Sequence, residues 1–99
     1  MRRRARTDDN HSAVAKRFRE LGWSVLDLSG VGSGCPDLLV ARNGMNVLVE
    51  IKDGAKAPSE QKLTAFQQSF HQTWKGPVAI VRSVEEATKI GANPMLIGL

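Results

Sequence analysis

The chain has 99 residues, of which 41% are hydrophobic and 24% are charged, a composition typical of one small globular domain. No apolar run approaches the roughly 20 residues that are needed to span a bilayer, so the pattern excludes a membrane protein. The single cysteine, Cys35, excludes an internal disulfide and a cysteine-rich zinc site. A cytoplasmic location, where thiols stay reduced, is therefore expected.

The basic residues, which give a net charge of +4, are concentrated near the N-terminus. Half of the fourteen are Arg2, Arg3, Arg4, Arg6, Lys16, Arg17 and Arg19. Residues 1–8 are predicted to form a flexible basic arm, and residues 9–99 a single domain. A basic arm beside a basic helix is the usual footprint of phosphate binding, although a solubilising terminus would give the same pattern.

A first helix is predicted to begin at the cap residues 8–10 and to end before Gly22. Its apolar stripe consists of His11, Val14, Phe18 and Leu21. Residues 23–28 then predict a first strand.

Glycines alternate along residues 30–34, between this strand and the next. They lead into a strand instead of opening a helix, and no Gly-Lys-Ser/Thr follows, so a phosphate-binding loop is excluded. Two roles stay open for this segment: close approach of the backbone to a large ligand, or a flexible connection.

The next segment predicts a β-hairpin. Leu38–Val40 and Val47–Val49 are apolar runs, which are typical of strands covered on both faces. Asn43-Gly44 between them is the strongest short hairpin signal. A two-residue turn at this dipeptide fixes the register of the two strands.

Three charged residues meet in that register. Asp37 is predicted to lie directly opposite Glu50, with Lys52 diagonal to it on the same face. Opposed carboxylates in a sheet are destabilising and costly to bury unless they are paired or bound to a metal. A hard cation such as Mg²⁺ would resolve the conflict. The alternative is the polar face of an edge strand, with Asp37 as a turn residue after Pro36.

The second half of the chain begins with a loop over residues 53–58 that carries Lys56. A helix follows over Leu63–Trp74, and Thr64 to Gln67 fits a capping box. The aromatic residues of this helix recur every three or four positions, so we expect them to pack in the core. Gln67 is either the cap partner or a polar group turned toward the site.

Residues 78–82 predict a buried strand. Ser83–Glu86 fits another capping box and begins a short helix that runs to Lys89 and is stopped by Gly91, and Met95–Leu99 forms an apolar tail. The predicted order is α-β-β-β-α-β with a short C-terminal helix. This is an α/β fold with a central mixed sheet flanked by helices.

These motifs together resemble a known family, the VRR-NUC domain, which is the virus-type replication-repair nuclease of the PD-(D/E)XK superfamily. The motifs are Gly34-Cys35-Pro36-Asp37, Val49-Glu50-Ile51-Lys52, Gln67 and the closing Val81–Ala87 segment. The family occurs alone in phages and bacteria and is fused in Fanconi-associated nuclease. The resemblance implies a restriction-endonuclease-like core and, for a phage protein, the cytoplasm of the bacterial host.

The resemblance also implies roles for the site residues. Asp37, Glu50 and the backbone carbonyl of Ile51 would bind Mg²⁺ or Mn²⁺. Lys52 would position or activate the attacking water, and Gln67 would lie near the site. The residue types suit this chemistry, because a metal lowers the pKa of its bound water and positive charge stabilises the transition state.

Relatives often carry a glutamate on the first helix that reaches a metal. The matching position here is Asn10 or His11, and both are weaker ligands for a hard cation than a carboxylate. His11 is equally well explained as a helix-start residue. The expected DNA-binding residues are Arg2, Arg3, Arg4, Arg6 and Lys56.

The expected function is a metal-dependent, structure-selective DNA endonuclease. The resemblance implies a Holliday junction resolvase of replication and repair that acts as a homodimer on branched DNA, since two sites are needed to cut two strands. The candidate interface residues are Phe66, Phe70, Trp74 and Met95–Leu99, with core packing favoured for the aromatics. The alternatives are a non-catalytic or weakly catalytic junction-binding accessory protein and a basic interaction module.

Overall fold

The computed structural model describes residues 9–97, so the predicted arm over residues 1–8 lies outside the described chain. The elements are α1 (His11–Glu20), β1 (Ser24–Asp27), β2 (Leu38–Arg42), β3 (Met45–Ile51), the 3-10 turn η1 (Pro58–Glu60), α2 (Ala65–Thr73), β4 (Val78–Val81), α3 (Val84–Ala92) and the 3-10 turn η2 (Pro94–Ile97). The predicted α/β order is confirmed. Among the described helices, none has the length and apolar character needed to cross a membrane.

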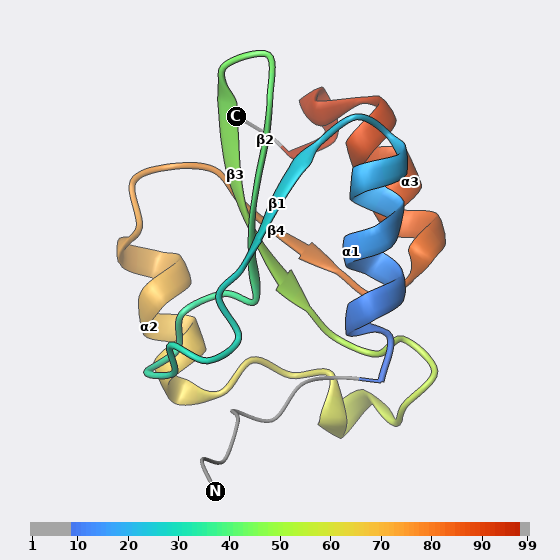
Figure 1. Ribbon diagram of the computed structural model, residues 1–99. Helices are drawn as coiled ribbons and strands as arrows, with labels where there is room; N and C mark the ends of the chain where they lie inside the picture. The colour runs from blue at the N-terminus through green and yellow to red at the C-terminus, as the bar shows by residue number, and fades with distance from the viewer. Residues whose placement is uncertain (1–8, 98–99) are drawn as a thin grey trace, which may run out of the picture.

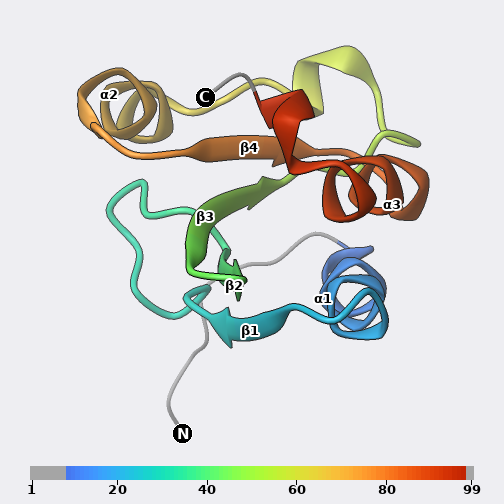
Figure 2. The same cartoon turned by 90° about the horizontal axis from the view of Figure 1, so that it is seen from above.

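The four strands form one mixed sheet in the order β1-β2-β3-β4. β1, β2 and β3 pair antiparallel, and β4 pairs parallel to β3. α1 and α3 lie on one side of the sheet and α2 on the other (Figure 1 and Figure 2). The sheet is therefore flanked by helices, as expected.

Asn43 and Gly44 form the predicted two-residue turn between β2 and β3. Both residues have positive φ angles, 52° and 78°, as a type I′ turn requires. Arg42 therefore pairs with Met45, and the ladder runs to Leu38 opposite Val49. The predicted register is confirmed up to this last pair.

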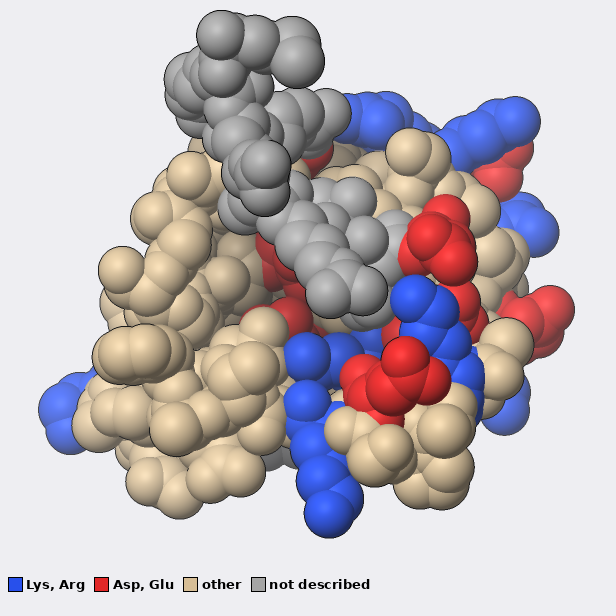
Figure 3. Space-filling view, turned by 90° about the horizontal axis from the view of Figure 1, so that it is seen from below, with Lys and Arg blue, Asp and Glu red and all other residues tan. Residues whose placement is uncertain are grey.

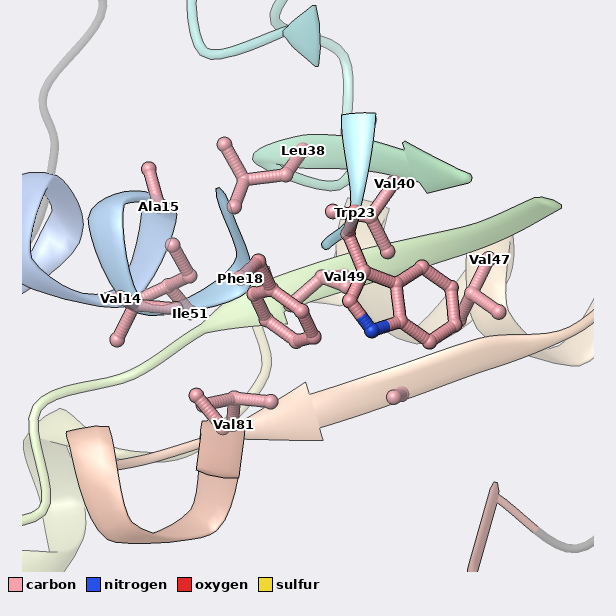
Figure 4. Packing of buried hydrophobic residues seen from close by; sticks show 12 residues of the cluster. Val14, Ala15, Phe18, Trp23, Leu38, Val40, Val47, Val49, Ile51 and Val81 are labelled. Atoms are coloured by element: carbon pink, nitrogen blue, oxygen red, sulfur yellow. The ribbon is translucent and has the colours of Figure 1, made fainter. Parts of the chain in front are cut away.

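The hydrophobic core fills the space between the sheet and the layer of α1 and α3 (Figure 4). Phe18 of α1 meets Trp23 edge to face, with ring centroids 6.0 Å apart. The odd-numbered residues from Val47 to Ile51 on β3 belong to this core. Because side chains alternate across a strand, Glu50 faces the opposite side, toward α2.

The aromatic stripe of α2 does not pack in the core, so that prediction is wrong. Phe66 is 73% exposed and Trp74 is 49% exposed, and of the residues described for α2 none is buried. Phe70 stacks on Trp74 with ring centroids 5.1 Å apart. The physical reason is that α1 and α3 already cover the apolar face of the sheet, while α2 faces its charged side.

Two further predictions for the C-terminal part are corrected. β4 alternates between buried and half-buried residues instead of being buried throughout. α3 does not end at Lys89 but continues through Gly91 to Ala92. Gly91 is buried inside the helix, and the position has no room for a side chain, because a Cβ there would lie 2.7 Å from Leu21 Cδ1. The Gly91 carbonyl accepts a 3.0 Å hydrogen bond from Trp23 Nε1.

Candidate active site

Glu50 and Lys52 lie on the α2 face of the sheet, where β3 ends. Glu50 is 2% exposed and Lys52 is 8% exposed, although charged side chains are rarely buried unless they are paired. Gln67 of α2 joins them: its Nε2 donates to Glu50 Oε2 at 3.2 Å, and its Oε1 accepts from Lys52 Nζ at 2.8 Å. The structure thus brings three of the predicted site residues into direct contact.

Gln67 also caps the helix that carries it. Its Oε1 accepts the backbone N–H of Thr64 at 2.9 Å, and its own N–H donates to Thr64 Oγ1 at 3.2 Å. These two bonds complete the predicted capping box. Gln67 is therefore both the cap partner of Thr64 and a polar group turned toward Glu50 and Lys52.

Asp37 lies just before β2, beside the end of β3. Its Oδ2 accepts the backbone N–H of Ile51 at 2.7 Å, and its own N–H donates to the carbonyl of Val49 at 2.9 Å. The direct pairing of Asp37 with Glu50 is not part of the ladder, which ends at Leu38. Beyond the ladder, the backbone N–H of Ile51 bonds to the Asp37 side chain instead of to a backbone carbonyl of β2.

His71 also lies in the site, although the sequence analysis does not single it out. Its side chain is 14% exposed, and its Nε2 lies 3.6 Å from Glu50 Oε1. Burial lowers the pKa of His71, and the Lys52 ammonium lowers it further, so the neutral imidazole is favoured. His71 follows Gln67 by four residues, and this helical spacing is the signal that places both on one face.

The glycine-rich loop holds the start of α2 in place. Gly34 has a φ of +80°, and a Cβ at this position would lie 2.4 Å from the carbonyl oxygen of Phe66. The backbone of Gly34 therefore comes close to another part of the chain, and the predicted approach of this loop to a large ligand stays a prediction. The partner of Gly34 is the first turn of α2, the turn that presents Gln67 to the site.

Cys35 reports on the electrostatic potential near the carboxylates. Burial raises the pKa of its thiol, and the negative charges of Glu50 and Asp37 raise it further. Both carboxylates therefore lie close enough to Cys35 to act on its thiol.

The structure separates the two candidates on the first helix. The side-chain amide of Asn10 donates to the carbonyls of Lys52 and Arg82, both at 3.2 Å, and so ties the helix start to the ends of β3 and β4. Its Oδ1 is buried and has no hydrogen-bond partner in the described chain. His11 is 8% exposed and lies 3.5 Å from Asp27 on β1. Asn10 is therefore the one that contacts the strand end of the site.

The predicted DNA-binding residues are only partly described. Arg2, Arg3, Arg4 and Arg6 lie outside the described residues. Lys56 lies in the loop after β3, with its Nζ 3.7 Å from Asp9 Oδ2. Figure 3 shows the end of the molecule below the sheet, where acidic and basic atoms lie together in the middle of the view and the side of α2, at the left, is mostly uncharged.

The donor atoms at the strand ends fit a hard divalent cation. Asp37 and Glu50 offer carboxylate oxygens, and Ile51 between Glu50 and Lys52 offers a backbone carbonyl. Within residues 9–97 no cluster of three or more Asp, Glu, His or Cys side chains is arranged to hold a metal. Water and phosphate oxygens would therefore complete the shell, as is usual for Mg²⁺.

The mixed sheet with α1 and α3 on one face, α2 on the other and a charged cluster at two strand ends defines a restriction-endonuclease-like α/β fold. Among solved structures, a VRR_NUC domain is 31% identical in sequence, with a TM-score of 0.64, and the alignment covers 85% of this chain and 92% of that chain. The chain therefore belongs to the VRR_NUC family of nuclease domains. No family model matches the chain, and no curated protein matches it.

Proposed function

We propose that this protein is a metal-dependent, structure-selective endonuclease that hydrolyses phosphodiester bonds in DNA, with Mg²⁺ or Mn²⁺ as its cofactor. The observation that carries the proposal is the pair of buried charges Glu50 and Lys52, which Gln67 joins through two hydrogen bonds, with Asp37 beside them. Buried charges are costly, and clusters of them in small proteins are frequent at functional sites. Membership of a nuclease family supports the same function.

Each residue has a role that follows from its chemistry. Asp37, Glu50 and the carbonyl of Ile51 would hold the cation, which supplies an acidified water and polarises the phosphate when bound. Lys52 Nζ, held at 2.8 Å by Gln67 Oε1, would position the attacking water and balance charge on the scissile phosphate. Gln67 would orient both charged groups from α2.

The proposed activity is tested with labelled four-way junctions, flaps and linear duplex, each incubated with Mg²⁺, Mn²⁺ or EDTA. Cleavage of branched substrates in either metal and none in EDTA is the expected result. Tight junction binding without cleavage in both metals would contradict the endonuclease and favour a DNA-binding accessory protein instead. Binding is expected to weaken steeply as salt rises, because phosphate contacts dominate affinity.

The variant Lys52→Ala tests the assigned site. It is expected to reduce the single-turnover cleavage rate by about 100-fold or more, in the range known for removal of a group that stabilises transition-state charge, while junction binding stays within a few fold. Lys89→Ala removes the same charge from an exposed position of α3 and should cleave at the wild-type rate. Equal cleavage by Lys52→Ala and Lys89→Ala would refute the assigned site.

We also propose that the protein acts as a homodimer that resolves Holliday junctions. Two active sites are needed to cut two strands of a junction, and a twofold dimer supplies them. The exposed aromatics of α2 are the surface that supports this proposal, since Phe66 is 73% exposed. The segment Ala65–Thr73 contains no Lys, Arg, Asp or Glu, so this helix suits contact with another copy better than contact with phosphate.

A further inference from the structure

His71 is a partly exposed residue whose Nε2 atom is buried, and the proposed chemistry leaves this residue without a role. Its side chain is 14% exposed, and within residues 9–97 its Nε2 atom has no hydrogen-bond partner. Buried polar atoms without a partner are uncommon in proteins and call for an explanation. The edge-to-face contact with the Phe70 ring, at 6.4 Å between centroids, explains where the imidazole lies but not why its Nε2 points at a carboxylate.

The geometry around Glu50 supplies that explanation. Gln67 and His71 are one helical turn apart on α2, and they approach different oxygens of the same carboxylate. Gln67 Nε2 donates to Oε2 at 3.2 Å, and His71 Nε2 lies 3.6 Å from Oε1. The second distance is just longer than a hydrogen bond, and contacts in active sites commonly shorten to hydrogen-bond length when the site is loaded.

We infer that His71 is a positioning residue for Glu50: its Nε2–H donates to Glu50 Oε1 in the loaded site and fixes the orientation in which this carboxylate binds the divalent cation. The inference rests on the proposed metal-dependent function. Outer-sphere donors of this kind typically change metal affinity or activity by about 10–100-fold when they are removed.

The experiment measures Mn²⁺ binding to the whole chain by electron paramagnetic resonance of free Mn²⁺, in the absence of DNA. His71→Leu removes the donor and keeps the volume, and we expect Mn²⁺ affinity to fall by about 10–100-fold. His71→Gln places an amide N–H near the position of Nε2, and we expect it to restore affinity to within about threefold of wild type. Gln72→Ala, an exposed neighbour on α2, is the matched control and should bind like wild type.

Thermal melting without metal controls for folding. If His71 has only a structural role, His71→Leu and His71→Gln will lower the melting temperature and leave Mn²⁺ affinity unchanged, which overturns the inference. Failure of His71→Gln to restore affinity in a folded protein also overturns it. If the wild type binds no Mn²⁺ and cleaves no junction, the proposed function is refuted as well. If the wild type does both and His71→Leu binds Mn²⁺ equally well, only the role of His71 is refuted.

Discussion

At the scale of single residues, Gln67 has one carboxamide for two purposes. The oxygen accepts both the Thr64 N–H and the Lys52 ammonium, and the nitrogen donates to Glu50. Asparagine is too short to reach both sets of partners, and glutamate would place a second negative charge against Glu50. The choice of residue at position 67 is therefore restricted both by the helix cap and by the contacts with Lys52 and Glu50.

A comparison of Gln67→Ala with Thr64→Ala separates these two purposes. Each variant removes half of the capping box, and we expect each to lower the free energy of unfolding by about 1 kcal/mol. Only Gln67→Ala also removes the partner of Lys52 and Glu50, so its cleavage rate should fall well below that of Thr64→Ala. Urea unfolding and single-turnover cleavage measure the two effects. Equal losses of cleavage would mean that helix capping alone accounts for Gln67.

The residues of the site differ in how well the sequence predicts them. Glu50 and Lys52 are predictable because a two-residue turn fixes their face, and Gln67 because a capping box has a fixed spacing. His71 has no such local signal; it becomes a candidate only when Gln67 is placed in the site and the helix is continued by one turn. Asp37 lies beside the end of β3, but its bond to the Ile51 backbone depends on a side-chain rotamer that no spacing rule gives.

At the scale of elements, the glycine-rich loop and α2 are held together at one point of close backbone contact. Gly34 tolerates no side chain there, because a Cβ would lie 2.4 Å from the Phe66 carbonyl oxygen. Gly32 has a similar φ, +77°, but nothing lies within 4 Å of a Cβ added to it. The two glycines thus differ in contact while sharing the left-handed conformation.

This difference gives a matched pair of variants. Gly32→Ala is expected to lower the free energy of unfolding only by the cost of a left-handed backbone at a residue with a Cβ, about 1–2 kcal/mol. Gly34→Ala carries the same penalty and must also displace the first turn of α2, so we expect a larger loss of stability and a loss of cleavage. Chemical denaturation and junction cleavage are the measurements. Similar behaviour of the two variants would show that the approach of Gly34 to Phe66 does not hold α2 in place.

The elements themselves were predictable to different degrees. The hairpin was predicted with its register because the Asn43-Gly44 turn is a local signal with a fixed geometry. The aromatic stripe of α2 was assigned to the wrong environment, because helical periodicity gives the spacing of apolar residues but not the surface they meet. That surface depends on α1 and α3, which are separate from α2 in the sequence and cover the apolar face of the sheet.

At the scale of the whole molecule, the core lies on one side of the sheet and the charged cluster on the other. The sheet face with Glu50 and Lys52 receives α2, whose own apolar residues point outward. An exposed aromatic surface on a small protein commonly marks an interaction site. Such a surface supports association through α2 and predicts that disrupting it will affect assembly more than folding.

Phe66→Asp tests this prediction against Met95→Asp. Both residues are strongly exposed, 73% and 76%, and they represent the two candidate interfaces. We expect the wild type and Met95→Asp to form dimers in sedimentation velocity, and Phe66→Asp to weaken the dimer by about 100-fold or more, in line with the loss of a central aromatic contact. A wild type that is monomeric at all concentrations, or a dimer that is disrupted only by Met95→Asp, would contradict the α2 interface.

The attachment of α2 through polar groups has a consequence for how the molecule fluctuates. Segments with few buried apolar contacts open most easily without unfolding the rest, and each such opening separates Gln67 from Lys52 and Glu50. A ligand that binds only the closed form stabilises that form in proportion to its concentration. Saturation with Mn²⁺ should therefore slow amide hydrogen exchange in Ala65–Thr73 more than in α1. The time that α2 spends closed then sets the fraction of molecules able to act at any moment.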